Sequence, residues 1–558
     1  MAAVAAATRM PFEWVEAALA SQTGTGTTLD QTIVPPAGNA YAPLAVGPGE
    51  PWIPHPANPV TVRAKNNKRR VLVAFSQLSD IHLTDSESPL RVEWMDRFAE
   101  DPHCSTFPVG SAWRPQETLS TQTMAAMVLA LNQVQLARTA SKQAPLAFAV
   151  STGDNTDNQQ RNELDWFKRG IVGGAQQGSS GDLARYEGVQ APDWGDRAYW
   201  IPRDDVPDDY KTQHGWPGES TWGFGPDQFL TSAIGSFSTP ALNHPCKVAF
   251  GNHDGLVQGT VADSELYRQV AVGGVKTALW PAAVADPCNH FGKLEQNLDQ
   301  LFTGPAKVVT PDPSRRLVTR REYVQALVGH GFTQSNADSC TAYYTLDDRR
   351  FRFIVLDTTN PGGKEDGSIG ARQFAWLEAR ISEAAGRYVI LLSHHGLHTL
   401  TNPVPAADAD PTSADPDCFA PPDDPRMRAP EVEAMLHQHP NVIAWVAGHT
   451  HQNRITLRRG ANGHVLWDIE TAAHVDWPCQ SRILEVIDDG PALTIRCTMV
   501  DHAGPVAHAD IAAANDPVLK LAAVHRELAA NDPQVDTAEG AGLREDRNVE
   551  LTLPKPAI

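Results

Sequence analysis

The sequence is poor in the features that define several classes of protein. Its 558 residues contain seven cysteines and no Cys-x-x-Cys pair, so neither a zinc finger nor a disulfide framework is indicated. One or two disulfides stay open, for example among Cys288, Cys340 and Cys418. No apolar run approaches the ~20 residues that a membrane helix needs. We also find no internal repeat and no low-complexity tract, which excludes repeat and fibrous architectures.

A targeting signal is missing as well. The first residues, MAAVAAATRMPFEW, lack the charged-then-apolar pattern of a secretory signal and contain no twin arginine. The basic run Lys68-Arg69-Arg70 leads straight into an apolar stretch, and we interpret it as the solvated edge of a strand. We therefore expect a cytoplasmic protein, unless a leader was removed before the numbering begins.

Positive charge is scarce relative to negative charge. The formal net charge is −20 at pH 7, and an acidic chain repels phosphate backbones. No basic stripe stands out in the sequence, so we expect neither nucleic acid nor a membrane as a partner, although a local basic pocket stays open. Hydrophobic residues make up 41% and charged residues 20% of the chain, which indicates a folded globular protein of several domains' length. Its oligomeric state is not readable.

Five short apolar runs indicate strands that are buried on both faces. They are VLVAF at 71–75, LAFAV at 146–150, KVAF at 247–250, YVILL at 388–392 and NVIAWVA at 441–447. Helical spacing of apolar residues lies between them, at 117–137, 371–385 and 429–438. Strands that alternate with helices predict an α/β fold. Later segments alternate with period two and predict a second, more antiparallel sheet packed on the first: 350–357, 464–471, 482–488 and 493–499.

The remaining stretches predict the organisation of the chain. Residues 1–65 are rich in Pro, Gly, Thr and Ala and indicate an extended N-terminal arm. We expect a catalytic domain over 66–505, interrupted by insertions at about 158–245 and 256–340. The first insertion is rich in aromatic residues, which favours an ordered segment that packs a small core of its own, caps the substrate, or does both. Residues 506–558 predict a helix followed by a polar tail, which either docks on the core or mediates association.

A polar motif follows each of the five predicted strands. In α/β sheets, ligands bind outside the carboxyl ends of the strands, so we expect these motifs to converge. Imidazole with carboxylate suits Zn, Fe, Mn, Co and Ni, and the absence of a nearby cysteine argues against a thiolate site. Each motif alone is weak, but five in order are a strong signal for a metal site. The motifs supply Asp80 and His82, then Asp154, then Asn252, His253 and Asp254, then His394 and His395, and finally His449 and His451.

This set of motifs resembles the calcineurin-like metallophosphoesterases. The order DIH, GDN, GNHD, HH and GHTH matches that superfamily and extends from Asp80 to His451. The long spacers, together with TGTTLDQT and ETAAHVDWPCQSR, also look like an actinobacterial sub-group with large insertions between the motifs. The resemblance implies a two-sheet sandwich flanked by helices, the four-layer αββα fold, and hydrolysis of a phosphomonoester or phosphodiester by a metal-bound hydroxide.

The resemblance also implies a binuclear site with two divalent ions, Mn, Fe or Zn. Asp80, His82 and His451 would hold the first ion, and Asp154 would bridge both ions. The second ion would be held by the remaining ligands, which are Asn252, His394 and His449.

Five more residues receive supporting roles. His253 would sit beside the phosphate and stabilise or protonate the leaving oxygen, and His395 would support the ligands without binding metal. Asp254 would either orient His253 or hold a turn. His474 and Asp476 follow a strand near GHTH, and they either orient a ligand imidazole or lie exposed on the surface.

One position departs from a coloured sub-group of the family. Purple acid phosphatases carry a tyrosine three residues after the bridging aspartate, where this chain has Asp157, so we expect a colourless site. The substrate would be a small phosphate ester. Two alternatives remain: a nuclease of the same superfamily, which the negative charge disfavours, and a non-catalytic metal-binding or scaffold protein that kept the fold.

Overall fold

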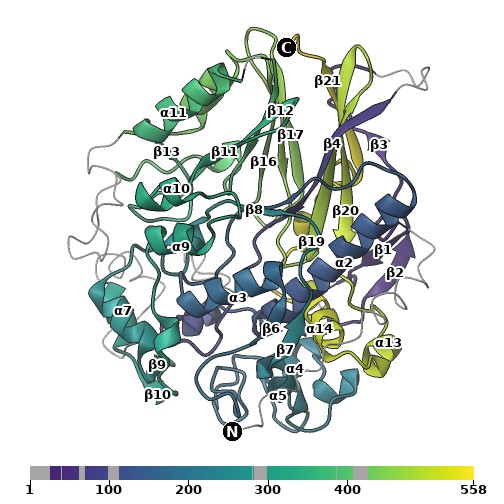
Figure 1. Ribbon diagram of the computed structural model, residues 1–558. Coiled ribbons are helices and arrows are strands. Elements are labelled where there is room, and N and C mark those ends of the chain that lie inside the picture. The colour runs from purple at the N-terminus through teal and green to yellow at the C-terminus, as the bar shows by residue number, and fades with distance from the viewer. Residues whose placement is uncertain are drawn as a thin grey trace, which may run out of the picture.

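Two β-sheets form the centre of the molecule in the computed structural model (Figure 1). The structure describes residues 25–38, 40–61, 69–98, 112–279, 281, 298–384, 386–405 and 425–558. Strands and helices alternate along much of this chain, so the predicted α/β class is confirmed. The ends of the predicted N-terminal arm and parts of the second insertion lie outside the described residues, as do Cys104, Cys288 and Cys418.

The first sheet has seven strands and a mixed arrangement. One side of it is parallel, because β4 pairs with β5 and β5 pairs with the edge strand β8 in the same direction. The antiparallel strands β19, β20 and β21 extend it on the other side of β4. The order is β3 (Ile53–Pro54), β21 (Val549–Pro554), β20 (Ala492–Asp501), β19 (Gln480–Asp488), β4 (Arg70–Leu78), β5 (Ala149–Ser151) and β8 (Cys246–Val248).

The second sheet has six strands, of which the middle four are parallel and the two edge strands are antiparallel. The order is β11 (Tyr344–Asp347), β12 (Phe351–Val355), β14 (Tyr388–Leu392), β16 (Val442–Ala447), β18 (Val465–Glu470) and β17 (Arg454–Arg459). The expected grouping of strands was therefore wrong. The five strands that precede the motifs are divided between the sheets, β4, β5 and β8 in one and β14 and β16 in the other.

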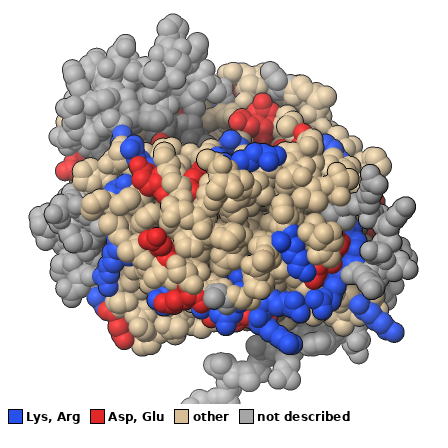
Figure 2. All heavy atoms as spheres, turned by 90° about the horizontal axis from the view of Figure 1, so that it is seen from above, with Lys and Arg blue, Asp and Glu red and all other residues tan. Residues whose placement is uncertain are grey.

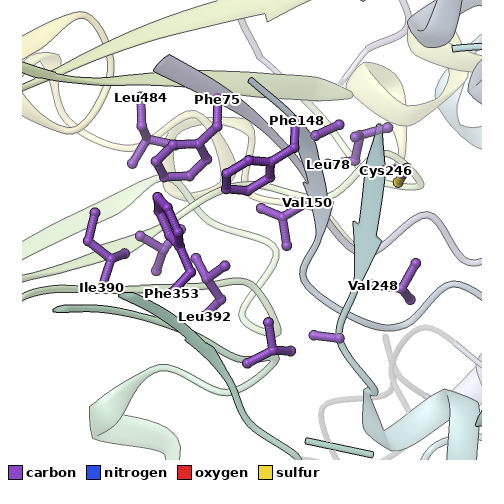
Figure 3. Close-up of a cluster of buried hydrophobic side chains, with 14 of the residues drawn as sticks. Phe75, Leu78, Phe148, Val150, Cys246, Val248, Phe353, Ile390, Leu392 and Leu484 are labelled. Atoms are coloured by element: carbon purple, nitrogen blue, oxygen red, sulfur yellow. The ribbon is translucent and has the colours of Figure 1, made fainter. Parts of the chain in front are cut away.

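The two sheets pack face to face across one apolar core. Phe75 of β4 and Phe353 of β12 meet edge to face with ring centroids 5.6 Å apart, and Phe148 lies 4.9 Å from Phe353. Figure 3 shows Phe353, with Ile390 and Leu392 of β14, pointing at the rings of the first sheet. These contacts set the spacing of the sheets and hence of the loops at their ends.

The second sheet is also covered on its outer face. Successive strand residues point to opposite sides, so Phe353 of β12 enters the core between the sheets while Ile354 faces outward. Leu377 of α11 (Ala371–Ser382) and Val432 of α12 (Ala429–Leu436) pack on that outer face. Figure 1 shows α11 beside β11 and β12. Both helices were predicted from their apolar spacing, and each ends two or three residues earlier than expected.

Helices from two distant parts of the chain lie beside the first sheet. The helix α2 (Ser120–Ala140) packs against α3 (Arg161–Val172) and against α14 (Pro517–Asn531). The C-terminal region therefore docks on the rest of the protein. The expected polar tail is wrong in part, because β21 pairs with β20 and extends the first sheet.

The aromatic residues of the first insertion form a second buried core. Trp200 and Trp222 are fully buried, and their rings are 6.0 Å apart in an edge-to-face contact. The cluster continues into α14 through Leu521 and Val524. Of the two interpretations for this segment, packing therefore holds for its buried aromatic rings.

Smaller elements complete the described structure. Four two-stranded sheets are β1 (Gln31–Val34) with β2 (Ala45–Pro48), β6 (Gly174–Gln176) with β7 (Phe237–Thr239), β9 (Val275–Thr277) with β10 (Ala306–Val308), and β13 (Ile369–Gly370) with β15 (Arg426–Met427). The short helices are α4 (Asp209–His214), α5 (Gln228–Ile234), α6 (Asn252–Gly255), α7 (Glu265–Val272), α9 (Arg320–Ala326), α10 (Gln334–Asp338), α13 (His508–Ala513) and α15 (Thr537–Ala541).

Cysteine and surface features bear on the remaining expectations. Cys340 is disulfide-bonded, whereas Cys246, Cys479 and Cys497 are free and buried.

None of the helices in the described ranges is long and apolar enough to cross a membrane. Figure 2 shows one face of the molecule, on which Lys and Arg lie among Asp and Glu.

The core between the sheets gives a stability prediction. Replacing Phe353 by alanine removes a ring that is 2% exposed, and it should lower the free energy of unfolding by about 3–5 kcal/mol. Thermal or denaturant unfolding measures the change. The control is Val308→Ala, where the side chain is 86% exposed and almost no change is expected. Equal effects in the two variants would contradict the position of the core.

Candidate metal centre

The polar motifs meet where the carboxyl ends of strands from both sheets come together. Backbone hydrogen bonds join the loops directly. The amide of Asp80 donates to the carbonyl of Gly153 at 3.2 Å, and the amide of His82 donates to the carbonyl of Asp154 at 2.9 Å. At the end of the second sheet, the amide of Gly448 donates to the carbonyl of His394 at 2.9 Å. The loops are thus held together by main-chain contacts before any side chain is considered.

Four overlapping groups of three side chains bring potential metal ligands within 4.8 Å of one another. Each group shares at least one member with another, so they form one continuous cluster. The groups are Asp80, His82 and His451; His82, Asp154 and His253; Asp80, Asp154 and His394; and His394, His395 and His449. These groups therefore bring together six of the seven side chains that the sequence assigns to the metals, all but Asn252.

The backbone is strained at five of these residues. Asp80, His82, Asp154, His449 and His451 have φ values between 44° and 76°, the left-handed region that L-residues other than glycine rarely adopt. Twelve non-glycine residues of the described chain have positive φ, so these five make up a large share. Such strain costs on the order of 1–3 kcal/mol per residue, and it concentrates at functional sites.

Two glycines allow the strained loops to approach each other. A Cβ at Gly448 would lie 1.8 Å from Ser79 Oγ and 2.3 Å from Asp80 Oδ2. A Cβ at Gly153, where φ is 104°, would lie 2.8 Å from His394 Nδ1. Any side chain at these positions would push ligands apart, which explains why glycine stands in both motifs.

One group of ligands is arranged around His82 and His451. Their Nε2 atoms lie 3.2 Å apart, and His451 Nε2 lies 3.5 Å from Asp80 Oδ1. Each ring has its other nitrogen on a carboxylate: His82 Nδ1 lies 3.0 Å from Asp157 Oδ1, and His451 Nδ1 lies 2.6 Å from Asp476 Oδ2. A carboxylate partner fixes the tautomer, so Nε2 is left to bind a cation. Two nitrogens bound to one ion at ~2.1 Å are about 3.0–3.4 Å apart, which the observed separation fits.

The second group is centred on His394. Its Nε2 atom lies 3.2 Å from Asp154 Oδ2, and its Nδ1 atom lies 3.1 Å from the carbonyl of Thr152. Asn252 donates from Nδ2 to the carbonyl of Gly259 at 3.0 Å, which leaves its buried Oδ1 without a hydrogen-bond partner. An orphaned buried amide oxygen is costly unless something outside the protein satisfies it. A metal cation would do so, and the donor set suits Mn, Fe or Zn.

Electrostatics at the cluster favour a cation. Burial alone would lower the pKa of His394, but the nearby carboxylates of Asp154 and Asp80 raise it to about 9. Burial likewise opposes protonation of His451, yet its bonds to Asp476 and Asp80 raise its pKa to about 9. The negative potential that retains protons on these imidazoles would also attract metal ions.

His253 lies at the edge of the cluster, with 22% of its side chain exposed. Its Nδ1 atom donates to the carbonyl of Asp157 at 2.6 Å, so Nε2 is its free ring nitrogen. Asp254 does not orient this ring. Its carboxylate accepts from the amides of Gly251, Asn155 and Thr156 at 3.0–3.1 Å. Asp254 therefore holds the loop that carries Asp154. Of its two expected roles, the structure favours the one of holding a turn.

Three predicted residues remain: His395, His474 and Asp476. Both ring nitrogens of His395 have partners, Thr358 Oγ1 at 2.7 Å and the carbonyl of Glu365 at 2.8 Å, so neither is free to bind metal. His474 is buried and its Nε2 atom lies 2.9 Å from Ser481 Oγ, so it is not on the surface, and the described hydrogen bonds include none from its ring to a ligand imidazole. Asp476 is buried and bound to His451, whereas its exposure was the alternative.

A further group of possible ligands is neutralised by arginine. His398, Asp468 and Glu470 lie within ligand distance of one another. However, Arg458 donates to Asp468 Oδ2 at 2.7 Å, and Arg454 Nη1 lies 2.7 Å from His398 Nε2. The Arg458 guanidinium offsets the charge of Asp468, and Arg454 occupies Nε2 of His398, so the arrangement does not favour an added cation.

Sequence reasoning missed the residues that support the two carboxylates. Arg91 donates to Asp157 Oδ2, and Arg114 Nε lies 2.8 Å from Asp476 Oδ1. Asp157 was noted only because it is not tyrosine, although its place three residues after Asp154 was a usable signal. Arg91, Arg114 and Glu117 stand in no motif, so the sequence carries no comparable signal for them.

Comparisons with known proteins give little further information. No family model matches the chain, and no curated protein matches it. Among solved structures, a dimetal phosphatase from Danio rerio is similar with a TM-score of 0.33 and 12% sequence identity. The match covers 78% of this chain and 100% of that one. Because the two structures superpose this poorly, the similarity says nothing about the fold or activity of this chain.

The raised pKa values predict proton release when metal binds. His394 and His451, each with a pKa of about 9, keep their protons below pH 9 in the metal-free protein, and a cation must displace them. We expect about two protons released per chain at pH 7.5, and metal affinity that falls as the pH decreases below 9. Calorimetric titration in buffers of different ionisation enthalpy measures the release. Binding heats independent of the buffer would contradict the protonated state of these two rings.

Proposed function

We propose that this protein is a metal-dependent phosphoesterase that hydrolyses a phosphomonoester or phosphodiester at a site for two divalent cations. The observation that carries the proposal is the continuous cluster of buried carboxylates and imidazoles at the junction of the two sheets. The proposal includes the finer fold, a four-layer αββα sandwich with α2 and α3 over one sheet and α11 and α12 over the other. It also includes a small phosphate ester as substrate.

The chain's own residues would divide the two ions between them. Asp80, His82 and His451 surround one position, where two Nε2 atoms and a carboxylate oxygen approach within 3.5 Å. Asp154 lies between the positions, since its Oδ2 is 3.7 Å from His82 Nε2 and 3.2 Å from His394 Nε2. When bound, two such cations supply Lewis-acid activation of water and offset the charge of a phosphoryl group.

The second position would be formed by Asn252, His394 and His449. Its clearest metal-binding atoms are Oδ1 of Asn252 and Nε2 of His394, both buried and without a hydrogen-bond partner. His449 Nε2 lies 3.8 Å from Asp366 Oδ1, a carboxylate that is 41% exposed. The ligands of this position are thus neutral apart from Asp154, in contrast to the position around Asp80.

His253 would act on the substrate rather than on the metals. Burial lowers its pKa to about 4, so the ring is neutral at pH 7 and carries a lone pair on Nε2. A phosphate ester beside Nε2 would add negative charge and raise that pKa. The ring would then hold a proton at Nε2 and give it to the leaving oxygen, because the bond from Nδ1 to Asp157 fixes its orientation.

The first test replaces the residue that lies between the two positions. Asp154→Asn keeps the size of the side chain but removes its charge, and we expect it to bind fewer than two ions and to lose hydrolysis of both an aryl phosphomonoester and a bis-aryl phosphodiester. Elemental analysis and the two assays measure this. The matched control is Asp205→Asn, at a carboxylate that is 67% exposed. A wild-type protein that binds no metal would overturn the proposal.

The second test separates His253 from the ligands. His253→Asn should keep both ions but lower kcat by roughly 10²–10⁴-fold, the usual contribution of general acid catalysis. The loss should be larger for an alkyl ester than for an aryl ester, because an aryl oxygen leaves without a proton. Equal losses for the two leaving groups would show that His253 does not act as the acid.

A further inference from the structure

A buried ring of charged groups links the two histidines that face each other. Because Asp157 and Asp476 accept from Nδ1 of His82 and His451, both Nε2 atoms carry lone pairs once the rings are neutral, the form in which imidazole binds a metal. These lone pairs point at each other across 3.2 Å. Such an arrangement is repulsive unless a cation lies between the rings, so the groups that hold the rings in place determine whether a cation binds there.

The two carboxylates are held in turn by arginines, and the arginines meet at one residue. Arg91 Nη1 donates to Asp157, and Arg114 Nε lies 2.8 Å from Asp476 Oδ1. Glu117 accepts from Arg91 Nη2 at 2.7 and 2.8 Å and from the backbone amide of Arg114 at 3.2 Å. The contacts therefore close a ring that runs from one imidazole to the other through Glu117.

The ring is deeply buried, and stability alone does not account for it. Arg91 is 1% exposed, Glu117 is 0% exposed and Arg114 is 7% exposed. Replacing buried ion pairs by apolar residues is often neutral or stabilising, because charges lose their hydration when they are buried. A series of charged groups that ends on two metal-ligand imidazoles therefore suggests a role in holding those imidazoles.

The other cation position lacks a comparable support. His394 Nδ1 lies against the backbone carbonyl of Thr152, and Asn252 is held by the carbonyl of Gly259. Neither ligand contacts a buried pair of arginine and carboxylate among the bonds that the described residues make. The ring therefore supports the ligands of only one cation position, the one around His82 and His451.

We propose that Glu117, together with Arg91 and Arg114, is a positioning residue that preorganises His82 and His451 for one of the two cations. Glu117 touches no metal ligand, so it acts only through the arginines and the two aspartates. This inference rests on the proposed two-cation site. It names the residues that raise the metal affinity of one position in that site.

The test is the metal affinity of Glu117→Gln, which keeps the size of the side chain and removes its charge. Metal-free protein is titrated with Mn²⁺, and free and bound Mn²⁺ are followed by electron paramagnetic resonance. We expect two ions in the wild type. In the variant, one ion should bind as before and the other roughly 10–100-fold more weakly, the usual effect of losing an outer-shell partner. The spectrum should change from that of a coupled pair to that of an isolated ion.

The matched control is Glu219→Gln. Glu219 is also buried, at 1% exposed, and accepts from the backbone amides of Asp227 and Phe229 in the first insertion. It should lower the thermal midpoint and still bind two ions with wild-type affinity. If Glu117→Gln does not fold, Asp476→Asn removes the negative charge from the group that accepts from His451 Nδ1 and should weaken the same ion.

Two results would overturn the proposal. In one, Glu117→Gln binds both ions as tightly as the wild type, so that the ring is only a structural cross-link. In the other, both ions weaken equally, so that the ring serves no particular position. A wild type that binds two ions but hydrolyses no ester would overturn the proposed function and leave this test intact. A wild type that binds no ion would overturn both.

Discussion

The burial of two carboxylates side by side is the constraint on which the rest of the site depends. Asp80 is 0% and Asp154 is 2% exposed, and an ionised carboxylate loses much of its hydration when it is buried. His82, His394 and His451 lie within 4 Å of these oxygens, and protons held on His394 and His451 offset the negative charge in the metal-free protein. The pKa of Asp80 stays low, at about 2, although burial opposes ionisation. A site with this balance attracts cations, and the proposed chemistry follows from that.

The surrounding fold supplies what the cluster requires. Five of the proposed ligands have a left-handed backbone, which costs on the order of 1–3 kcal/mol each. The packed core between the two sheets, with Phe75, Phe148 and Phe353 at its centre, holds the loops in that conformation. Glycines at the closest approaches remove the side chains that would otherwise separate the loops. Strain at the loops is thus tolerated because the sheets beneath them are rigid.

The two halves of the cluster are built differently. Around His82 and His451, carboxylates and arginines continue the network for two further layers into the protein. Around His394 and Asn252, backbone carbonyls take the same part. Ligand charge and outer contacts both tune how tightly an ion is held, so unequal surroundings imply unequal sites. The difference arises from residues far apart in the chain, from Arg91 to Asp476.

Local pattern was enough to predict part of this structure. Apolar runs located β4, β5, β8, β14 and β16, because a buried strand needs side chains that are apolar on both faces. Apolar residues three or four positions apart located α2, α11 and α12, because the buried face of a helix has that spacing. The motif order predicted which side chains would converge, since ligand types and strand ends are both local properties of the sequence.

Tertiary structure alone decided the rest. It divided the five strands between two sheets and placed β21 in the first sheet, because strand pairing depends on partners that are distant in the chain. It also assigned Asp254 to the loop of Asp154 and closed the ring through Glu117. Contacts between residues far apart in the chain, such as Arg114 and Asp476, leave no periodicity in the sequence. The sequence by itself predicted the candidate ligands, and the packing of the two sheets determined what holds them.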